Sequence, residues 1–419
     1  MTSPQTSSPT RAARRPDIPA GVALSGAAIA FTSLYLAAGA VTPLLVHYRE
    51  QWKFPAALLT LAFAVYAIGF LATVLTLGSL SDHVGRRPVL IGALIVQLAS
   101  NAVLLVAPDI GWVIAGRVLQ GGAAGAATTA FTAALVELAP ANRERLGTIL
   151  GSVGLTGGLA AGSLLAGLAI QLTTTANSIV FTVLAAITMV GLVGVALSPE
   201  SVTRAPGALS ALIPRVAIPP ATRRELAAAA PVIAATWMLA GLSGGLAPSM
   251  VRSVFHLDSG LLNGLSGAIA PAASAAAGLV VARLEPRRAM TIGIHASIAG
   301  ALGIMSGAVA GSLATMIVGQ ALAGVGFGAC FTASLVLIFP LAPSHQRAAV
   351  VAVIYVIAYI AFGAPVVVAG QLTDTLGLVP TVFWYSTVTI FLALFSLAAQ
   401  LRLQRANSVP VSTAPTTRS

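Results

Sequence analysis

Long stretches without any charged residue alternate with short charged segments along the chain. Five stretches have the length of one membrane-crossing helix, which needs about 20 apolar residues because lipid offers the backbone no hydrogen-bond partners. Each is predicted to form one helical span. They lie between Asp17 and Arg49, Lys53 and Asp82, Arg87 and Asp109, Arg117 and Glu137, and Arg224 and Arg252, the last interrupted only by Glu225 at its edge.

Two longer uncharged stretches, from Arg145 to Glu200 and from Arg288 to Arg347, exceed one crossing. A polar turn at 173–177 divides the first and a small-residue turn at 310–312 divides the second, so each holds two spans. The sequence therefore predicts an all-α membrane protein with twelve transmembrane helices. The remaining three spans are 259–282, 348–372 and 377–400.

Composition and charge support a membrane protein. The 419 residues are 57% hydrophobic and 8% charged, against roughly 25% charged residues in soluble proteins, so a soluble globule is excluded. Of 22 Lys and Arg, 18 fall on the tails and on one set of alternate loops, and Arg117 alone lies in a span. The positive-inside rule places both termini in the cytoplasm, and the net charge of +11 needs no nucleic-acid partner. The single cysteine, Cys330, can form no intrachain disulfide.

The first span follows a polar leader with three arginines. Its apolar part, about 22–46, exceeds the 7 to 15 residues typical of a cleaved signal, so we expect a retained helix.

The two halves of the chain resemble each other at an offset near 200 residues. FTAALV at 131–136 recurs as FTASLV at 331–336, and GRVLQGGAAG at 116–125 recurs as GQALAGVGFG at 319–328. This period indicates a duplicated six-span bundle. We expect two pseudo-symmetric six-helix bundles at 20–197 and 226–400, a cytoplasmic linker at 198–225, and cytoplasmic tails at 1–19 and 401–419.

Glycine and proline occupy matching positions in two spans, as Gly39 with Pro43 in span 1 and Gly244 with Pro248 in span 7. Proline bends a helix by freeing a backbone carbonyl, and a nearby glycine lets it move. Both spans are expected to flex as gates.

The loop after span 2 reads GSLSDHVGRRPVL at 78–90. Glycines allow a tight turn, and an acid beside a helix N-terminus is favourable. The string resembles the signature of the major facilitator superfamily between its second and third helices. The matching residues are Gly78, Leu80, Asp82, Gly85, Arg86 and Arg87. The resemblance implies a conformational latch in which Glu137, at the inner end of span 4, joins Asp82 and Arg86 and locks the outward-facing state.

Span 4 contains IAGRVLQGGAAG at 114–125, which resembles the second motif of the family. Arg117 costs roughly 2.5 to 3.5 kcal/mol at mid-bilayer, so it should face a cavity or a partner, with Gln120 on the same helix face. An arginine that snorkels to the outer interface is the alternative.

Three features depart from the family pattern. In the second half, Ala282 and Glu285 replace the expected aspartate and glycine, which predicts a weaker latch there. Ser163 stands where the antiporter motif of span 5 has proline. Span 1 lacks the carboxylate that many proton-coupled exporters of the family carry.

The resemblance implies a central pathway lined by spans 1, 4, 7 and 10. A cavity with Arg117 and no central acid favours anionic or neutral amphipathic solutes over cations. The candidate proton carriers are Glu137, Asp258, His295 or the substrate itself. His295 is attractive for its pKa, although a single histidine near the inner end of span 9 is more often a packed, hydrogen-bonded residue. The candidate pathway residues are Thr32, Tyr35, Arg117, Gln120, Trp237 and Gln320.

Enzyme and pump motifs lack their structural context. GLSGG at 241–245 lies inside a span rather than at a strand-to-helix elbow, and GVGFGA at 324–329 has no preceding strand. The histidines show no metal-ligand spacing, and Lys53 belongs to no phosphate-binding loop, so we expect no metal, cofactor or nucleotide.

These patterns favour a monomeric secondary transporter in the cytoplasmic (inner) membrane that works by alternating access. Proton-coupled efflux of drug-like or amphipathic compounds is the leading hypothesis. The alternatives are a proton-coupled or facilitative importer of a small nutrient or organic anion, and a membrane enzyme or receptor on the same scaffold, for which no catalytic cluster is found.

Overall fold

The computed structural model describes residues 19–202, 205–214, 216–281, 283–343 and 346–408. All regular elements in these segments are helices, and the prediction of an all-α membrane protein is confirmed. Most of both predicted tails, 1–18 and 409–419, and Ala282 lie outside the described residues.

The helices follow one another with short connections. In the first half they are α1 (Ala20–Trp52), α2 (Ala56–Leu77), α3 (Ser81–Val84), α4 (Arg86–Leu105), α5 (Ile110–Glu137), η1 (Ala141–Arg143), α6 (Glu144–Leu172) and α7 (Ala176–Leu197). Two short helices follow in the linker, α8 (Ala208–Ala211) and η2 (Pro220–Thr222). The second half contains α9 (Arg223–Gly245), α10 (Ala247–Ser253), α11 (Gly260–Val281), α12 (Pro286–Ala310), α13 (Leu313–Ile338), η3 (Phe339–Leu341), α14 (Arg347–Leu376) and α15 (Leu378–Ser408). The last helix continues past the predicted end at 400.

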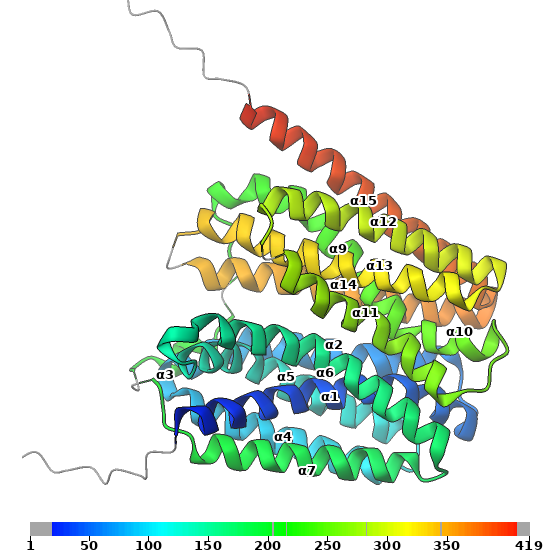
Figure 1. The fold of residues 1–419 in the computed structure, drawn as a ribbon, viewed down its shortest axis with the longest axis horizontal. Helices are drawn as coiled ribbons and strands as arrows, with labels where there is room; N and C mark the ends of the chain where they lie inside the picture. Colours follow the sequence, from blue (N-terminus) through cyan, green and yellow to red (C-terminus); the bar gives the residue numbers. More distant parts are fainter. Residues whose placement is uncertain (1–18, 203–204, 215, 282, 344–345, 409–419) are drawn as a thin grey trace, which may run out of the picture.

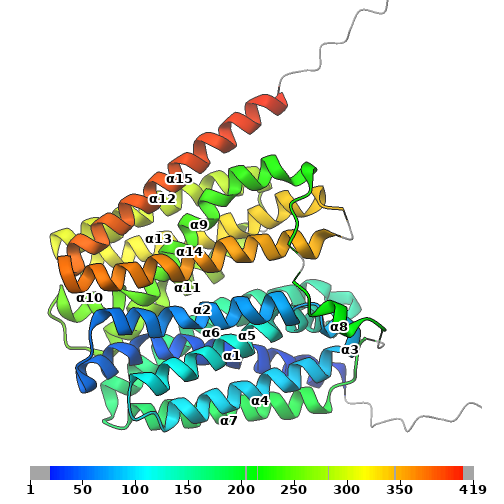
Figure 2. The same ribbon diagram turned by 180° about the vertical axis from the view of Figure 1, so that it is seen from behind.

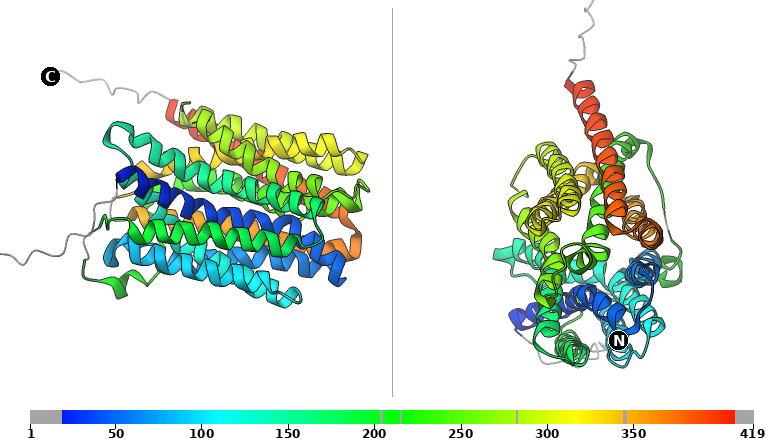
Figure 3. Two further views of the ribbon diagram at one scale, coloured as in Figure 1. Left: turned by 60° about the horizontal axis from the view of Figure 1, so that its bottom comes forward. Right: turned by 90° about the vertical axis from the view of Figure 1, so that its right-hand side faces the viewer.

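The long helices form two groups, one from each half of the chain (Figures 1 and 2). Along the seam between them α2 packs against α14, and α6 packs against α11. Helix α1 begins and α15 ends on the same side of the molecule, which we call the terminal side (Figure 3). The opposite side, where α1 ends and α2 begins, is the far side.

Eleven helices of the described chain are long and apolar enough to cross a membrane. Helix α5 is not among them, because Arg117, Gln120 and its glycines lower its mean hydropathy. It is nevertheless 28 residues long and packs against α2 and α4 within the first half. The multi-pass architecture is confirmed, while the twelfth crossing stays a prediction.

Polar side chains cap the starts of two long helices. Asp109 caps α5 by accepting hydrogen bonds from the Gly111 and Trp112 amides at 2.8 and 3.3 Å. Ser312 caps α13 through the Thr315 amide. Such caps satisfy amides that have no partner inside the helix.

The two glycine–proline pairs behave differently. Span 7 is broken at Leu246, and Pro248 lies in the first turn of α10, where its missing N–H is harmless. Pro43 instead lies inside the continuous helix α1. The expected symmetry of these two spans is therefore incomplete.

The repeated glycines make equivalent contacts in both halves. A Cβ on Gly121 would lie 2.1 Å from the carbonyl oxygen of Tyr66, and one on Gly324 would lie 2.1 Å from that of Ala270. Only glycine lets these backbones approach so closely, as small residues do in membrane helix pairs. The pattern read from the sequence thus corresponds to one helix-packing device used twice, between α5 and α2 and between α13 and α11.

Candidate functional site

A central cavity lies between the two halves and contains about 970 Å³ of empty space, including its open mouth. Its wall comes from α1, α2, α5 and α6 of the first half and from α9, α11, α13 and α14 of the second. Most lining side chains are apolar or aromatic, with a few hydroxyls such as Thr42, Thr156 and Ser274. The cavity can therefore hold a small organic molecule.

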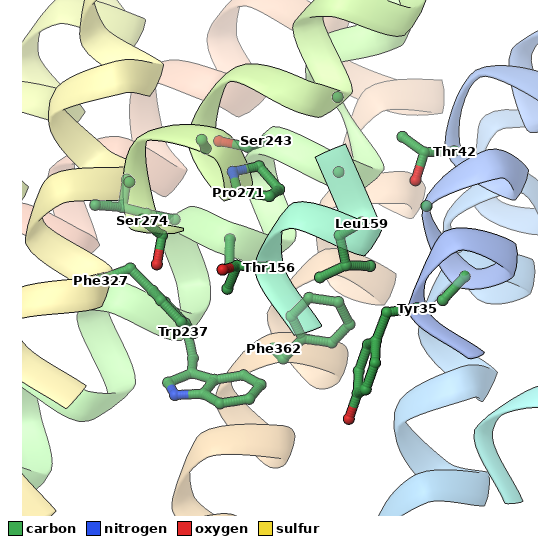
Figure 4. Close-up of a pocket in the computed structure, with 18 of the residues that line it drawn as sticks. Tyr35, Thr42, Thr156, Leu159, Trp237, Ser243, Pro271, Ser274, Phe327 and Phe362 are labelled. Carbon is green, nitrogen blue, oxygen red and sulfur yellow. The ribbon is translucent and has the colours of Figure 1, made fainter. Parts of the chain in front are cut away.

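Aromatic rings form one wall of this cavity around Trp237. Its indole lies 4.7 Å from the ring centre of Tyr359, 5.2 Å from that of Phe327 and 6.0 Å from that of Phe362. Figure 4 shows Trp237, Phe327 and Phe362 around the same space, with Tyr35 of α1 across from them. Three helices of the second half thus supply a continuous aromatic surface.

Arg117 lines the cavity from α5 and is 2% exposed. Its guanidinium donates hydrogen bonds to the carbonyls of Ala62 and Phe63 at 3.3 and 3.2 Å and to Gln120 Oε1 at 2.5 Å. It also lies 4.6 Å from the ring centre of Tyr66, a cation–π contact. This burial rules out the snorkelling alternative.

No ion pair found among the described residues includes Arg117. Its partners are neutral oxygens and a ring, so its positive charge is solvated but not neutralised. A buried charge without a counterion is costly. An anionic group would therefore be favoured next to Arg117.

Only some of the other predicted pathway residues line the cavity. Tyr35 and Trp237 line the cavity, and Gln120 supports Arg117 from behind the lining. Thr32 faces α6, where its Oγ1 lies beside Gly154. Gln320, the repeat partner of Arg117, is fully buried outside the lining.

Several lining residues were missed by sequence reasoning. Tyr66, Phe327, Tyr359 and Phe362 come from spans 2, 10 and 11, and Ser243 was considered only as part of the GLSGG string. The available signal was the presence of aromatic residues within apolar spans. Which of them point inward depends on helix rotation, which hydropathy does not encode.

The predicted latch residues lie together on the terminal side. Arg86 forms ion pairs with Asp82 and, at 3.3 Å, with Glu137, which accepts a hydrogen bond from Ser201 Oγ at 2.5 Å. Arg87 donates to the carbonyl of Ala196 in α7. All of these partners belong to the first half or to the start of the linker.

Gly78 and Gly85 have separate roles at this cluster. The Gly78 carbonyl accepts a hydrogen bond from Thr129 Oγ1 at 2.7 Å, which ties α2 to α5. Gly85 has φ +103°, a conformation that favours glycine, and a Cβ there would lie 2.5 Å from Glu200 Oε2. Glu200, which sequence reasoning missed, accepts from the Arg86 and Arg87 amides at 2.8 and 3.1 Å and thereby caps α4.

The second half carries a different cluster at the equivalent place. Arg287 pairs with Glu225 at 2.8 Å and bonds Gln400 of α15 at 3.1 Å. Glu285 accepts from the Arg287 and Arg288 amides, so it caps α12 itself. An acid at position 285 thus performs locally the capping that Glu200 performs across helices in the first half.

Polar contacts join the two halves on the far side. Arg252 of α10 pairs with Glu50 of α1 at 2.6 Å and with Asp258 at 3.0 Å. Asp374 of α14 accepts hydrogen bonds from the Ala56 and Ala57 amides at the start of α2, both at 3.0 Å.

The α6–α11 seam is also joined there. Ser163 Oγ donates to the Gly264 carbonyl at 2.8 Å, and Ser259 Oγ donates to Gln171 at 3.1 Å. Helices α5 and α13, which face each other across the cavity, make their extensive contacts only within their own halves. The far side is therefore the closed side of this conformation.

The candidate proton carriers lie outside the cavity. Glu137 pairs with Arg86 in the predicted latch, Asp258 pairs with Arg252 on the far side, and His295 is exposed on α12 with Nδ1 2.8 Å from the Thr291 carbonyl oxygen. No Asp, Glu or His lines the cavity in the described part of the chain. No cluster of three His, Cys, Asp or Glu that could hold a metal ion occurs among the described residues.

Comparison with known proteins agrees with this architecture. The model of the Major Facilitator Superfamily matches residues 27–364. No curated protein matches the chain.

Solved structures show the same fold at low identity. A POT family transporter in complex with 5-aminolevulinic acid is 12% identical, with a TM-score of 0.72 over 92% of this chain and 96% of that one. A bacterial homolog of the human lysosomal transporter Spinster, in an inward-facing and unoccupied conformation, is 14% identical, with a TM-score of 0.72 over 94% and 99%.

Proposed function

We infer the function from one premise: this chain belongs to the Major Facilitator Superfamily. It is a multi-pass membrane transporter rather than an enzyme. We propose that it moves a small organic solute by alternating access, in which two bundles rock about a site at the membrane midplane. The observation that carries this proposal is the cavity between the halves, together with the polar contacts that join the halves on its far side.

The positive-inside rule supports a cytoplasmic terminal side in the inner membrane. The far-side contacts then close the route to the exterior, and the conformation is inward-facing. In the outward-facing state, the cluster around Arg86 and Glu137 would meet the second half instead. The proposed transport mechanism needs one monomer in a bilayer and no cofactor or nucleotide.

We propose that transport is outward: the protein exports drug-like or amphipathic compounds in exchange for protons. The apolar, aromatic wall with few hydroxyls supports this substrate range better than a hydrophilic nutrient. Uptake of a small organic anion is the second candidate, because Arg117 brings a positive charge to the wall. Glu137 is the preferred proton carrier, because it is paired with Arg86 in the cluster that would rearrange during the cycle, whereas His295 is exposed on α12.

Flux into proteoliposomes under imposed pH gradients tests this proposal. Antiport predicts that substrate accumulates in vesicles with an acidic lumen, whereas symport predicts accumulation when the external medium is acidic. A protonophore should abolish either gradient-driven accumulation, and protein-free vesicles give the background. Accumulation that ignores the pH gradient would contradict proton coupling.

A further inference from the structure

Three residues that line the central cavity, Tyr66, Trp237 and Ser243, carry hydrogen-bond donors without partners. Tyr66 OH, Trp237 Nε1 and Ser243 Oγ are buried and have no hydrogen-bond partner among the described residues. The indole nitrogen can only donate, and the two hydroxyls have protons to donate. A ligand that offers acceptor oxygens would satisfy groups that the protein leaves open.

The charge of the cavity wall also favours a ligand with acceptor oxygens. Among the residues that the structure describes, Arg117 is the one Lys or Arg in the lining, and no Asp or Glu lies there to neutralise it. Next to it, Gln120 uses Oε1 to accept from Arg117, while its Nε2 donor has no partner. An anionic oxygen beside Arg117 would meet a cation, and a cationic ligand would meet repulsion.

Aromatic rings connect this polar region to the apolar wall. Arg117 lies over the rings of Tyr66 and Phe63 at 4.6 and 6.0 Å, and Phe63 lies 5.1 Å from Phe362 across the seam between the halves. Phe362 in turn lies 6.0 Å from Trp237. A ligand reaching from Arg117 to Trp237 would therefore have an apolar or aromatic body.

We propose that the transported solute is an amphipathic organic anion, a carboxylate or sulfonate on an aryl or long alkyl body. Its acidic group lies toward Arg117 and Tyr66. Its apolar body lies against the aromatic wall formed by Trp237, Phe327, Tyr359 and Phe362. This assignment rests on the proposed transport function and narrows it to one charge class.

Binding of matched ligands to the purified full-length protein tests the charge class. The probes are 4-phenylbutyrate, 4-phenylbutanamide and 4-phenylbutylammonium, with naphthyl and pyrenyl analogues of each, measured by calorimetry in detergent. The carboxylate of each set should bind at least about 10-fold more tightly than the ammonium compound, a difference of about 1.4 kcal/mol. Equal binding, preference for the cation, or no binding of any carboxylate overturns the proposal.

Variants assign the preference to the cavity. Arg117→Gln should remove the preference for the carboxylate, while Arg117→Lys should retain it with lower affinity. Arg402→Gln removes the same charge from an exposed position on α15 and should leave binding unchanged. Unchanged selectivity in a folded Arg117→Gln protein, judged by gel filtration, overturns the assignment.

Transport of the same probes separates this inference from the proposed function. Carboxylate binding without flux in proteoliposomes contradicts transport and leaves the anion site standing. Flux of the ammonium compound but not of the carboxylate supports transport and overturns the anion assignment.

Discussion

Gly85 and Glu285 occupy corresponding positions in the two halves, and each fits a different way of capping the following helix. Glu200 reaches the amides of α4 from beyond α7 and fills the space that a side chain at position 85 would need. In the second half, the acid stands in the chain immediately before α12. Glu285, the departure from the family pattern that predicted a weaker latch, thus also supplies the helix cap from a different position in the chain. The residue that decides this, Glu200, lies more than 100 positions from the motif it supports.

Removal of this carboxylate should destabilise the protein. Glu200→Ala leaves two amides at the start of α4 without their acceptor, and we expect a loss of about 1 to 2 kcal/mol in the free energy of unfolding. Glu200→Gln keeps one acceptor oxygen and should recover part of this loss. Unfolding in an SDS titration measures both variants. An alanine variant as stable as the original chain would contradict the capping role.

At the scale of helices, the same contact recurs where the sequence repeats. Gly125 approaches the carbonyl of Phe70, and Gly328 approaches that of Ser274, one turn beyond the contacts of Gly121 and Gly324. Each pair of glycines at four-residue spacing forms a smooth helix face. These faces bring α5 onto α2 and α13 onto α11, which places Arg117 and Phe327 at the cavity.

Alanine at Gly121 or Gly324 should disturb this packing. In Gly121→Ala and Gly324→Ala the new Cβ would lie 2.1 Å from a backbone oxygen, so the helices must separate, at a cost of about 1 to 3 kcal/mol. Gly92→Ala on α4 is the matched control, because nothing lies within 4 Å of its Cβ. Thermal unfolding in detergent should rank both variants below the control. Equal melting temperatures for all three would refute the packing role.

For the whole molecule, the distribution of contacts defines one conformation. One ion pair, a helix cap and close backbone contacts join the halves on the far side, while α5 and α13 pack within their own halves around the cavity. Alternating access requires the far-side contacts to break in each cycle. They are individually modest, which suits a gate whose closed and open states must be close in free energy.

A covalent lock on the far side should stop the cycle. We expect oxidation to join cysteines that replace Gln171 and Ser259, whose side chains are hydrogen-bonded across the α6–α11 seam. Cys330 is fully buried and should not compete. Oxidised protein should show no flux in proteoliposomes, and a reductant should restore it. Either single cysteine variant should transport under oxidising conditions, and full transport by the locked protein would exclude gating at this seam.

Sequence alone determined the helical, multi-pass character of this protein, its internal repeat and the position of its latch motif. Lipid forces each crossing to satisfy its own backbone, so long apolar runs predict helices without knowledge of their neighbours. Tertiary structure decided which residues meet: Tyr66 with Arg117, Glu200 with the start of α4, and Trp237 with rings from two other helices. It also excluded Thr32 and Gln320 from the lining and broke span 7 at Leu246. Faces turned to lipid and faces turned to protein are equally apolar, so helix rotation and pairing cannot be read from hydropathy.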